Sequence, residues 1–231
     1  MVNSIDNREK INCLVLLSGG LDCAAALWYA KRKGWNPLCL HLYNPNTITQ
    51  AEPELAHAQL QADFFNVELV IDDKSSLPQK TKENMYSVLQ GMSAIAMIIQ
   101  GNKDIDFKYI VWGANADDSF RQRLQLRYPL RALAAGQSHQ LEVHGVKPRH
   151  IIQAPLNIFP FEYLYKSEII SMIAQDKPEL LDLVWSCSGK YKNDDRFGYV
   201  PCGKCTKCLE FKYAKHTAKK SLFKKQEGKW V

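Results

Sequence analysis

The stretch Ile11-Asn-Cys-Leu-Val-Leu-Leu-Ser-Gly-Gly-Leu-Asp22 decides the fold of this chain. Its apolar run, residues 13–17, is typical of a strand buried on both faces, and the alanine-rich segment that follows has the composition of a helix ending at Gly34. Two adjacent glycines in the join, residues 18–22, let the backbone pass close to a ligand, and a helix start offers unpaired N–H groups. We therefore predict a phosphate-binding turn; an ordinary tight strand-to-helix turn is the alternative.

Length and composition are those of an ordinary globular protein. The chain has 231 residues, of which 46% are apolar and 23% charged, enough for one α/β domain with a small appendage. Residues 1–10 are polar and mixed in charge, so we expect no signal peptide, and no apolar run is long enough to cross a bilayer. The prediction is a cytoplasmic protein with no membrane partner.

Strand and helix patterns alternate along the chain. Apolar runs predict further strands at residues 37–42, 67–71, 109–112 and 151–155. Helical patterns are predicted at residues 51–62, 84–100 and 161–173. This rhythm is typical of a doubly wound parallel sheet, whose ligand lies beyond the carboxyl ends of the strands. Three loops should meet there, at residues 18–22, 43–47 and 113–119.

The third of these loops brings polar and basic side chains to the predicted ligand edge. Asn115, Asp118 and Ser119 lie in it, and Arg121 and Arg123 follow. The planar fork of arginine matches carboxylate or phosphate oxygens, so the two arginines are the preferred grip on an anionic substrate. The alternative is that they form the solvated side of a helix.

Lys166 stands one turn into the predicted helix at residues 161–173. An ammonium group beside a triphosphate could neutralise the charge that builds on the bridging oxygen. Alternatively, Lys166 forms an i,i+4 surface pair with Glu162.

Four of the seven cysteines lie near the end of the chain. Cys202, Cys205 and Cys208 occupy overlapping CxxC turns, and Cys187 completes a tetrahedral set. Because four thiolates leave no open position, we predict one structural zinc. It would hold a small lobe at residues 181–231, beside an α/β domain at residues 1–180 that contains the predicted phosphate-binding turn. A redox dithiol is the alternative, but it does not need four cysteines.

The net charge is +6, and lysines crowd the tail from Lys204 to Lys229. Such a run could meet nucleic acid or an acidic partner, but it is more often the solvated face of a helix. We therefore expect no nucleic-acid partner, and a homodimer stays open.

Together these motifs resemble the 7-cyano-7-deazaguanine synthase (QueC) family of the PP-loop ATP pyrophosphatases. The matching segments are residues 18–22, residues 113–119, Lys166-Ser-Glu-Ile169 and residues 185–208. The resemblance implies an adenine nucleotide alpha hydrolase-like fold that binds ATP, Mg²⁺ and zinc. The implied nucleotide contacts are Leu16, Leu17, Ser18, Gly19, Gly20, Leu21, Asp22 and Cys23. The implied catalytic residues are Asp22, Lys166 and Asp118, and the substrate contacts are Asn115, Asp118, Ser119, Arg121 and Arg123.

The reaction implied by the resemblance is adenylation of 7-carboxy-7-deazaguanine with release of pyrophosphate. An amine, either ammonia or a protein amine, then displaces AMP to give an amide or 7-cyano-7-deazaguanine. Three departures surround the pocket: Cys23 replaces a serine, Tyr43-Asn-Pro-Asn46 replaces a Tyr-Gly-Gln-Arg-His-like stretch, and Ser87-Val88 stands where an Arg-Asn pair is expected. They indicate a divergent branch. Such a homologue could act in antiphage defence of the CBASS type, joining a deazaguanine to a protein amine, or bind nucleotide without catalysis.

Overall fold

The computed structural model describes residues 12–43, 45, 50–73, 107–117, 156–194 and 198–226, with side chains as far as Lys219. Five strands form one sheet: β1 (Cys13–Leu16), β2 (Pro37–Tyr43), β3 (Leu69–Asp73), β4 (Tyr109–Val111) and β5 (Leu156–Ile158). Their order is β3-β2-β1-β4-β5, and every neighbouring pair is parallel. This is the order of a doubly wound sheet, so the predicted fold class is confirmed.

Strand β1 is the centre of the sheet and is buried on both faces. Leu14 packs with Leu38 and Ile110 on one face, whereas Cys13 and Val15 belong to the cluster on the other face. Successive side chains of a strand point to opposite faces, so a strand covered on both sides needs a continuous apolar run. The continuous apolar run at residues 13–17 therefore has a direct structural cause.

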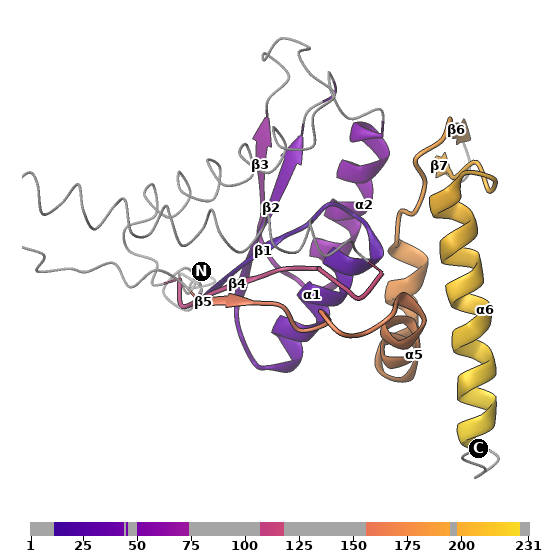
Figure 1. Ribbon diagram of the computed structural model, residues 1–231. Helices are drawn as coiled ribbons and strands as arrows, with labels where there is room; N and C mark the ends of the chain where they lie inside the picture. The colour runs from indigo at the N-terminus through magenta and orange to yellow at the C-terminus, as the bar shows by residue number, and fades with distance from the viewer. Residues whose placement is uncertain are drawn as a thin grey trace, which may run out of the picture.

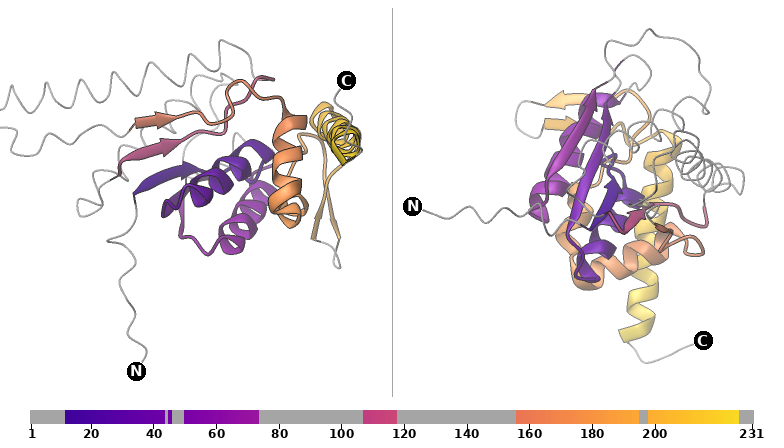
Figure 2. Two further views of the ribbon diagram at one scale, coloured as in Figure 1. Left: turned by 90° about the horizontal axis from the view of Figure 1, so that it is seen from below. Right: turned by 90° about the vertical axis from the view of Figure 1, so that its left-hand side faces the viewer.

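Helices α1 (Leu21–Arg32) and α2 (Ala51–Phe64) lie on the same side of the sheet (Figure 1). Four alanines of α1 are fully buried: Ala24, Ala25, Ala26 and Ala30. Their small side chains let the helix approach its neighbours closely. Helix α5 (Lys166–Asp176) and the 3₁₀ turn η2 (Pro178–Leu183) follow β5, and α6 (Thr206–Gln226) packs against α5 on the side away from the sheet (Figures 1 and 2).

One hydrophobic cluster joins the helices of both predicted domains. Trp28 of α1 and Ile169 of α5 share it with Leu180, Ala214 and Ala218, so elements on both sides of residue 180 contribute to one core. The boundary at residue 180 stays a prediction. Among the described residues, no helix combines the length and hydropathy that a membrane span requires.

Two of the described elements begin later than the sequence predicts. Strand β3 begins at Leu69, two residues later than expected, and α5 begins at Lys166 instead of Phe161. Phe161 is buried and forms an isolated parallel bridge with Asn115. Because these residues follow β5 and β4, the bridge continues the pairing of the two strands beyond their ends. The backbone N–H of Tyr165 donates to Glu168 at 2.8 Å, a contact typical of a helix start. Predicted elements at residues 84–100 and 151–155 lie outside the described residues, and the described strand nearby is β5.

The segment between η2 and α6 forms a small hairpin. Strands β6 (Lys192–Asp194) and β7 (Gly198–Val200) pair in antiparallel fashion. The rings of Trp185, Tyr191 and Tyr199 meet edge to face beside it, with centroids 5.4 to 6.5 Å apart. The segment before Cys202 therefore has its own packed aromatic support.

Candidate functional site

The glycine turn connects β1 to α1 in a conformation that only glycine tolerates well. Gly19 has a φ of +78°, and a Cβ there would lie 2.6 Å from the backbone oxygen of Glu54. Gly20 caps α1 in an extended conformation without a side-chain hydrogen bond, and the amide of Ala24 donates to its carbonyl at 3.0 Å. The start of α1 therefore has its backbone donors available for an anionic ligand.

Two segments distant in sequence hold this turn through one carbonyl group. The Gly19 oxygen accepts hydrogen bonds from the backbone N–H of Trp185 at 2.8 Å and from Nε2 of Gln61 at 2.7 Å. Gln61 also donates to the carbonyl of Leu183 at 3.0 Å, and Nδ1 of His57 lies 2.9 Å from the same oxygen. Helix α2 and the segment after η2 thus fix the turn together.

The loop after β4 lies directly against the first turn of α1. A Cβ on Gly113 would come within 2.5 Å of the Asp22 backbone, so these two predicted loops do converge. Asn115 is fully buried and accepts a hydrogen bond from the Asp117 amide at 2.8 Å. The Asp117 carboxylate in turn accepts from the Lys166 amide at 2.9 Å, which ties this loop to the start of α5.

The observed contact of the Asn115 side chain is within its own loop, where it accepts from the Asp117 amide. Its role in substrate binding stays a prediction. The remaining predicted residues of this loop lie outside the described part of the chain: Asp118, Ser119, Arg121 and Arg123. Their roles also stay predictions.

A pocket of about 250 Å³ opens at the glycine turn. Ser18 and residues 20–23 line it on the turn, and Glu54, Gly113 and Lys166 come from the neighbouring elements. The rest of the lining comes from the carboxyl-terminal part of the chain: Trp185, Ser186, Cys187, Lys207, Glu210 and Phe211. Leu16, Leu17 and Gly19 do not line the pocket. Segments far apart in sequence therefore build one cavity beside a helix start.

Cys23 places a thiol group in the glycine turn. The hydroxyl of Ser18 donates to Sγ of Cys23 at 3.3 Å. Burial raises the pKa of the Cys23 thiol above its ordinary value, so the group is a neutral thiol at neutral pH. The sulfur is therefore a partner for Ser18 within the turn.

Glu54 is a pocket residue that the sequence analysis did not single out. It lies in the first turn of α2 and is half-buried. Burial raises the pKa of its carboxyl to about 7, and the positive charge of Lys207 opposes that shift. Its position at a helix start that follows a sheet strand is the signal that could have identified it.

Lys166 is the first residue of α5, and its ammonium nitrogen lies 3.8 Å from a carboxylate oxygen of Glu210 on α6. Glu162 precedes the helix, so Lys166 and Glu162 are not neighbours on one helix face. The predicted lysine therefore does reach the pocket, where a carboxylate from the carboxyl-terminal helix accompanies it.

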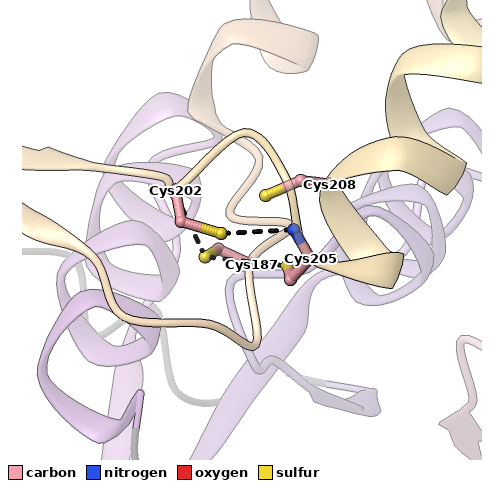
Figure 3. A group of neighbouring side chains, drawn as sticks. All are labelled: Cys187, Cys202, Cys205 and Cys208. Atoms are coloured by element: carbon pink, nitrogen blue, oxygen red, sulfur yellow. Dashed lines mark hydrogen bonds between the residues drawn. The ribbon is translucent and has the colours of Figure 1, made fainter.

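The four predicted cysteine ligands come together in space. Their sulfur atoms all lie within 4.8 Å of one another, and Figure 3 shows the side chains of Cys187, Cys202, Cys205 and Cys208 gathered around one point. All four are free thiols. Sulfurs placed tetrahedrally at 2.3 Å from one ion are about 3.8 Å apart, so this cluster could hold a metal ion.

Backbone amides support the cysteine cluster. The Ser188 amide donates to Sγ of Cys205 at 3.3 Å and lowers the pKa of that thiol to about 5, while the Cys202 amide donates to Sγ of Cys187 at 3.4 Å. A Cβ on Gly189 would lie 2.8 Å from Sγ of Cys202, so the chain turns closely around the sulfurs. Such amide donors stabilise thiolates, the form in which cysteine binds metal.

The cluster directly adjoins the pocket. Cys187 belongs to the pocket lining, and Ser186 beside it donates from Oγ to the Lys207 carbonyl at 3.2 Å. Gln50, which precedes α2, donates to the Gly189 carbonyl at 2.6 Å. The predicted metal lobe is thus part of the wall of the candidate nucleotide site.

Fold and site define an α/β protein with a doubly wound parallel sheet, a glycine turn at the head of α1 and a four-cysteine cluster beside it. The U34-tRNA thiolase NcsA from Methanococcus maripaludis, solved with its [4Fe-4S] cluster, is similar with a TM-score of 0.50 and 15% identity, over 94% of this chain and 67% of that one. At this identity the likeness shows the fold alone.

Two further solved structures are less similar. A 4-thiouridine synthetase in complex with RNA and ATP has a TM-score of 0.49 and 13% identity, over 94% of this chain and 52% of that one. NMN synthetase from Francisella tularensis has a TM-score of 0.36 and 13% identity, over 93% of this chain and 90% of that one. No protein-family model and no curated protein matches the chain.

Proposed function

We propose that this protein is an ATP-dependent adenylating ligase that activates a carboxylate and transfers the acyl group to an amine. The observation that carries the proposal is the pocket at the glycine turn, which combines a helix start with Lys166 and Lys207. Backbone N–H groups and two ammonium groups suit a polyphosphate. Adenylation turns a carboxylate oxygen into a good leaving group, so a pyrophosphate site and an acyl site belong together.

The residues of the pocket have distinct roles in this proposal. The turn, residues 18–23, holds the departing pyrophosphate through its backbone amides. Lys166 offsets the charge that develops on the bridging oxygen. The carboxylate of Asp22 lines the pocket, and an oxygen ligand of this kind suits Mg²⁺, which would neutralise phosphate charge when bound.

The proposed acyl substrate is 7-carboxy-7-deazaguanine, on the resemblance of the chain motifs to the QueC family. The amine is ammonia or a protein amine, and the product is an amide or 7-cyano-7-deazaguanine. Asp118, Ser119, Arg121 and Arg123 are proposed to hold this substrate. Either amine attacks the same adenylated carboxylate. The adenylation step is therefore the same for both amines.

We also propose that the cysteine cluster binds one structural Zn²⁺. A four-iron cluster places each thiolate on a different iron and spreads the sulfurs further apart than a single ion does. Sulfurs within 4.8 Å of one another favour the single ion. Freshly reduced protein should contain about one zinc per chain and lack an iron–sulfur absorption band; iron without zinc would contradict this assignment.

The test of the main proposal is product analysis. Pure protein incubated with ATP, Mg²⁺, 7-carboxy-7-deazaguanine and an ammonium salt should release AMP and pyrophosphate, and mass spectrometry should find the amide or the nitrile. Asp22→Ala should abolish AMP release while the thermal midpoint stays close to that of wild type. Asp182→Ala, an exposed acidic residue outside the pocket lining, is the matched control. Release of ADP, or activity in Asp22→Ala, would contradict the proposal.

A nucleotide-binding module without catalysis is the second candidate. The observation in its favour is the hydrogen bond from Ser18 to Cys23, which engages the serine hydroxyl within the turn. Tight ATP binding without AMP release, with every amine offered, would support this candidate. Transfer to a protein amine, as in a defence role, would instead appear as a mass increase on an acceptor protein.

A further inference from the structure

Glu54 is placed beside the phosphate-binding turn by the backbone. It lies in the first turn of α2, and its own carbonyl oxygen faces Gly19 so closely that a Cβ on Gly19 would be 2.6 Å away. Its side chain belongs to the pocket lining and is half-buried. The carboxylate is therefore held next to the site at which the proposed reaction takes place.

The charged groups around Glu54 come from three other elements. Asp22 lies on α1, Lys166 on α5, and Lys207 and Glu210 on α6, and all four line the same pocket. Within the described part of the chain, Glu54 forms no ion pair, although the charge of Lys207 reaches its carboxyl. A half-buried carboxylate without a close cation is costly, and such groups are concentrated at functional sites.

The proposed function requires a proton acceptor in this pocket. An alkylamine or ammonia is mostly a cation at neutral pH, and its nitrogen has no lone pair until a proton has left. Three carboxylates line the pocket, but Asp22 is assigned to the nucleotide and Glu210 pairs with Lys166. Glu54 is the carboxylate without another assigned role in the acyl transfer.

We infer that Glu54 is the general base for acyl transfer, accepting the proton of the attacking amine; this inference rests on the proposed function. An N–H bond of the ammonium breaks and an O–H bond forms on the Glu54 carboxylate. The freed lone pair of nitrogen forms the C–N bond. The C–O bond to AMP then breaks, and AMP leaves with that electron pair. The nitrogen, which carries a positive charge after the attack, loses a second proton to solvent and gives the neutral amide.

The test separates the two halves of the reaction. Glu54→Gln should retain ATP–pyrophosphate exchange in the presence of 7-carboxy-7-deazaguanine, within about twofold of wild type, because adenylation consumes no amine. Amide formation from an ammonium salt should fall by roughly 10² to 10⁴. Hydroxylamine is largely uncharged at neutral pH, so it should restore product formation in the variant as a hydroxamate.

Two variants control for structure. Glu52→Gln removes an exposed carboxyl from the same turn of α2, one that hydrogen-bonds to Tyr43 and does not line the pocket. It should leave both half-reactions unchanged. Glu54→Asp keeps a carboxylate and should form more amide than Glu54→Gln. Thermal midpoint and zinc content establish that each variant is folded.

Three results would overturn the inference. Equal loss of exchange and of amide formation in Glu54→Gln would assign Glu54 to nucleotide or Mg²⁺ binding. Undiminished amide formation would show that no base is needed there, and failure of hydroxylamine to rescue would remove the proton-transfer role. Wild-type protein without any exchange or AMP release would instead remove the proposed function, and the inference with it.

Discussion

Replacing Glu54 with glutamine should stabilise the fold above neutral pH. Burial raises the pKa of this carboxyl from its ordinary value of 4.5 to about 7, so the folded chain binds the proton more tightly than the unfolded chain. Ionisation therefore costs stability progressively between pH 4.5 and pH 7, and the cost stays constant above. At about 1.4 kcal/mol per pKa unit, the full cost is roughly 3 kcal/mol before solvent screening of the half-exposed group.

Glutamine has the same shape and does not ionise, so the variant avoids this cost. Its advantage in the free energy of unfolding should grow by about 1 to 2 kcal/mol between pH 5.5 and pH 8.5 once solvent screening is included, with most of the growth below pH 7. The assay is urea unfolding followed by circular dichroism at several pH values, with zinc content checked at each. The groups that share the pocket are Asp22, Cys23, Lys166, Lys207 and Glu210, and they are unchanged in the comparison.

The matched control is Glu52→Gln, which removes one negative charge from the same helix turn at an exposed position. It isolates the general effect of net charge on stability. An advantage of Glu54→Gln that stays constant across the pH range would refute the reasoning, because a shifted pKa necessarily produces a slope. A variant that is less stable than wild type at pH 8.5 would refute it as well.

Three other perturbations test the support of the turn. Gly113→Ala should lower the free energy of unfolding by roughly 1 to 3 kcal/mol and weaken ATP binding in calorimetry, because the added Cβ would meet the Asp22 backbone at 2.5 Å. A variant as stable as wild type would contradict this close packing. Gln61→Leu should lower the free energy of unfolding, measured with urea, by about 1 to 3 kcal/mol, because the Gly19 carbonyl loses a buried hydrogen-bond donor. Unchanged stability would show that Gln61 does not support the turn. Cys208→Ser should lower the zinc content below one ion per chain and also weaken ATP binding. A full zinc content by elemental analysis would show that Cys208 is not a ligand.

Short-range chemistry explains which features were predictable from the sequence. The apolar run of β1, the glycines at its end and the alanines of α1 each act within a few residues, and they determine a strand, a tight turn and a helix. The alternation of such units predicts a parallel sheet, as observed. Three of the four cysteines lie within seven residues, so their spacing alone indicates that they could share one ion.

Element boundaries were less predictable because they depend on distant partners. The pattern from Phe161 onward is compatible with a helix, but Phe161 is buried and bridges to Asn115, which belongs to the loop after β4. Helix α5 consequently begins at Lys166, and this places the lysine amide at the Asp117 carboxylate. No local pattern encodes that contact.

The sequence by itself determined the fold class, the position of the glycine turn and the identity of the cysteine set, because each depends on residues close together in the chain. Only the tertiary structure decided that the Trp185 amide and Gln61 converge on the Gly19 carbonyl, and that Glu54 and Lys207 line one pocket with the turn. The physical reason is that these contacts join segments up to more than a hundred residues apart, and hydrogen bonds and burial of that kind exist only once the sheet and its helices have packed.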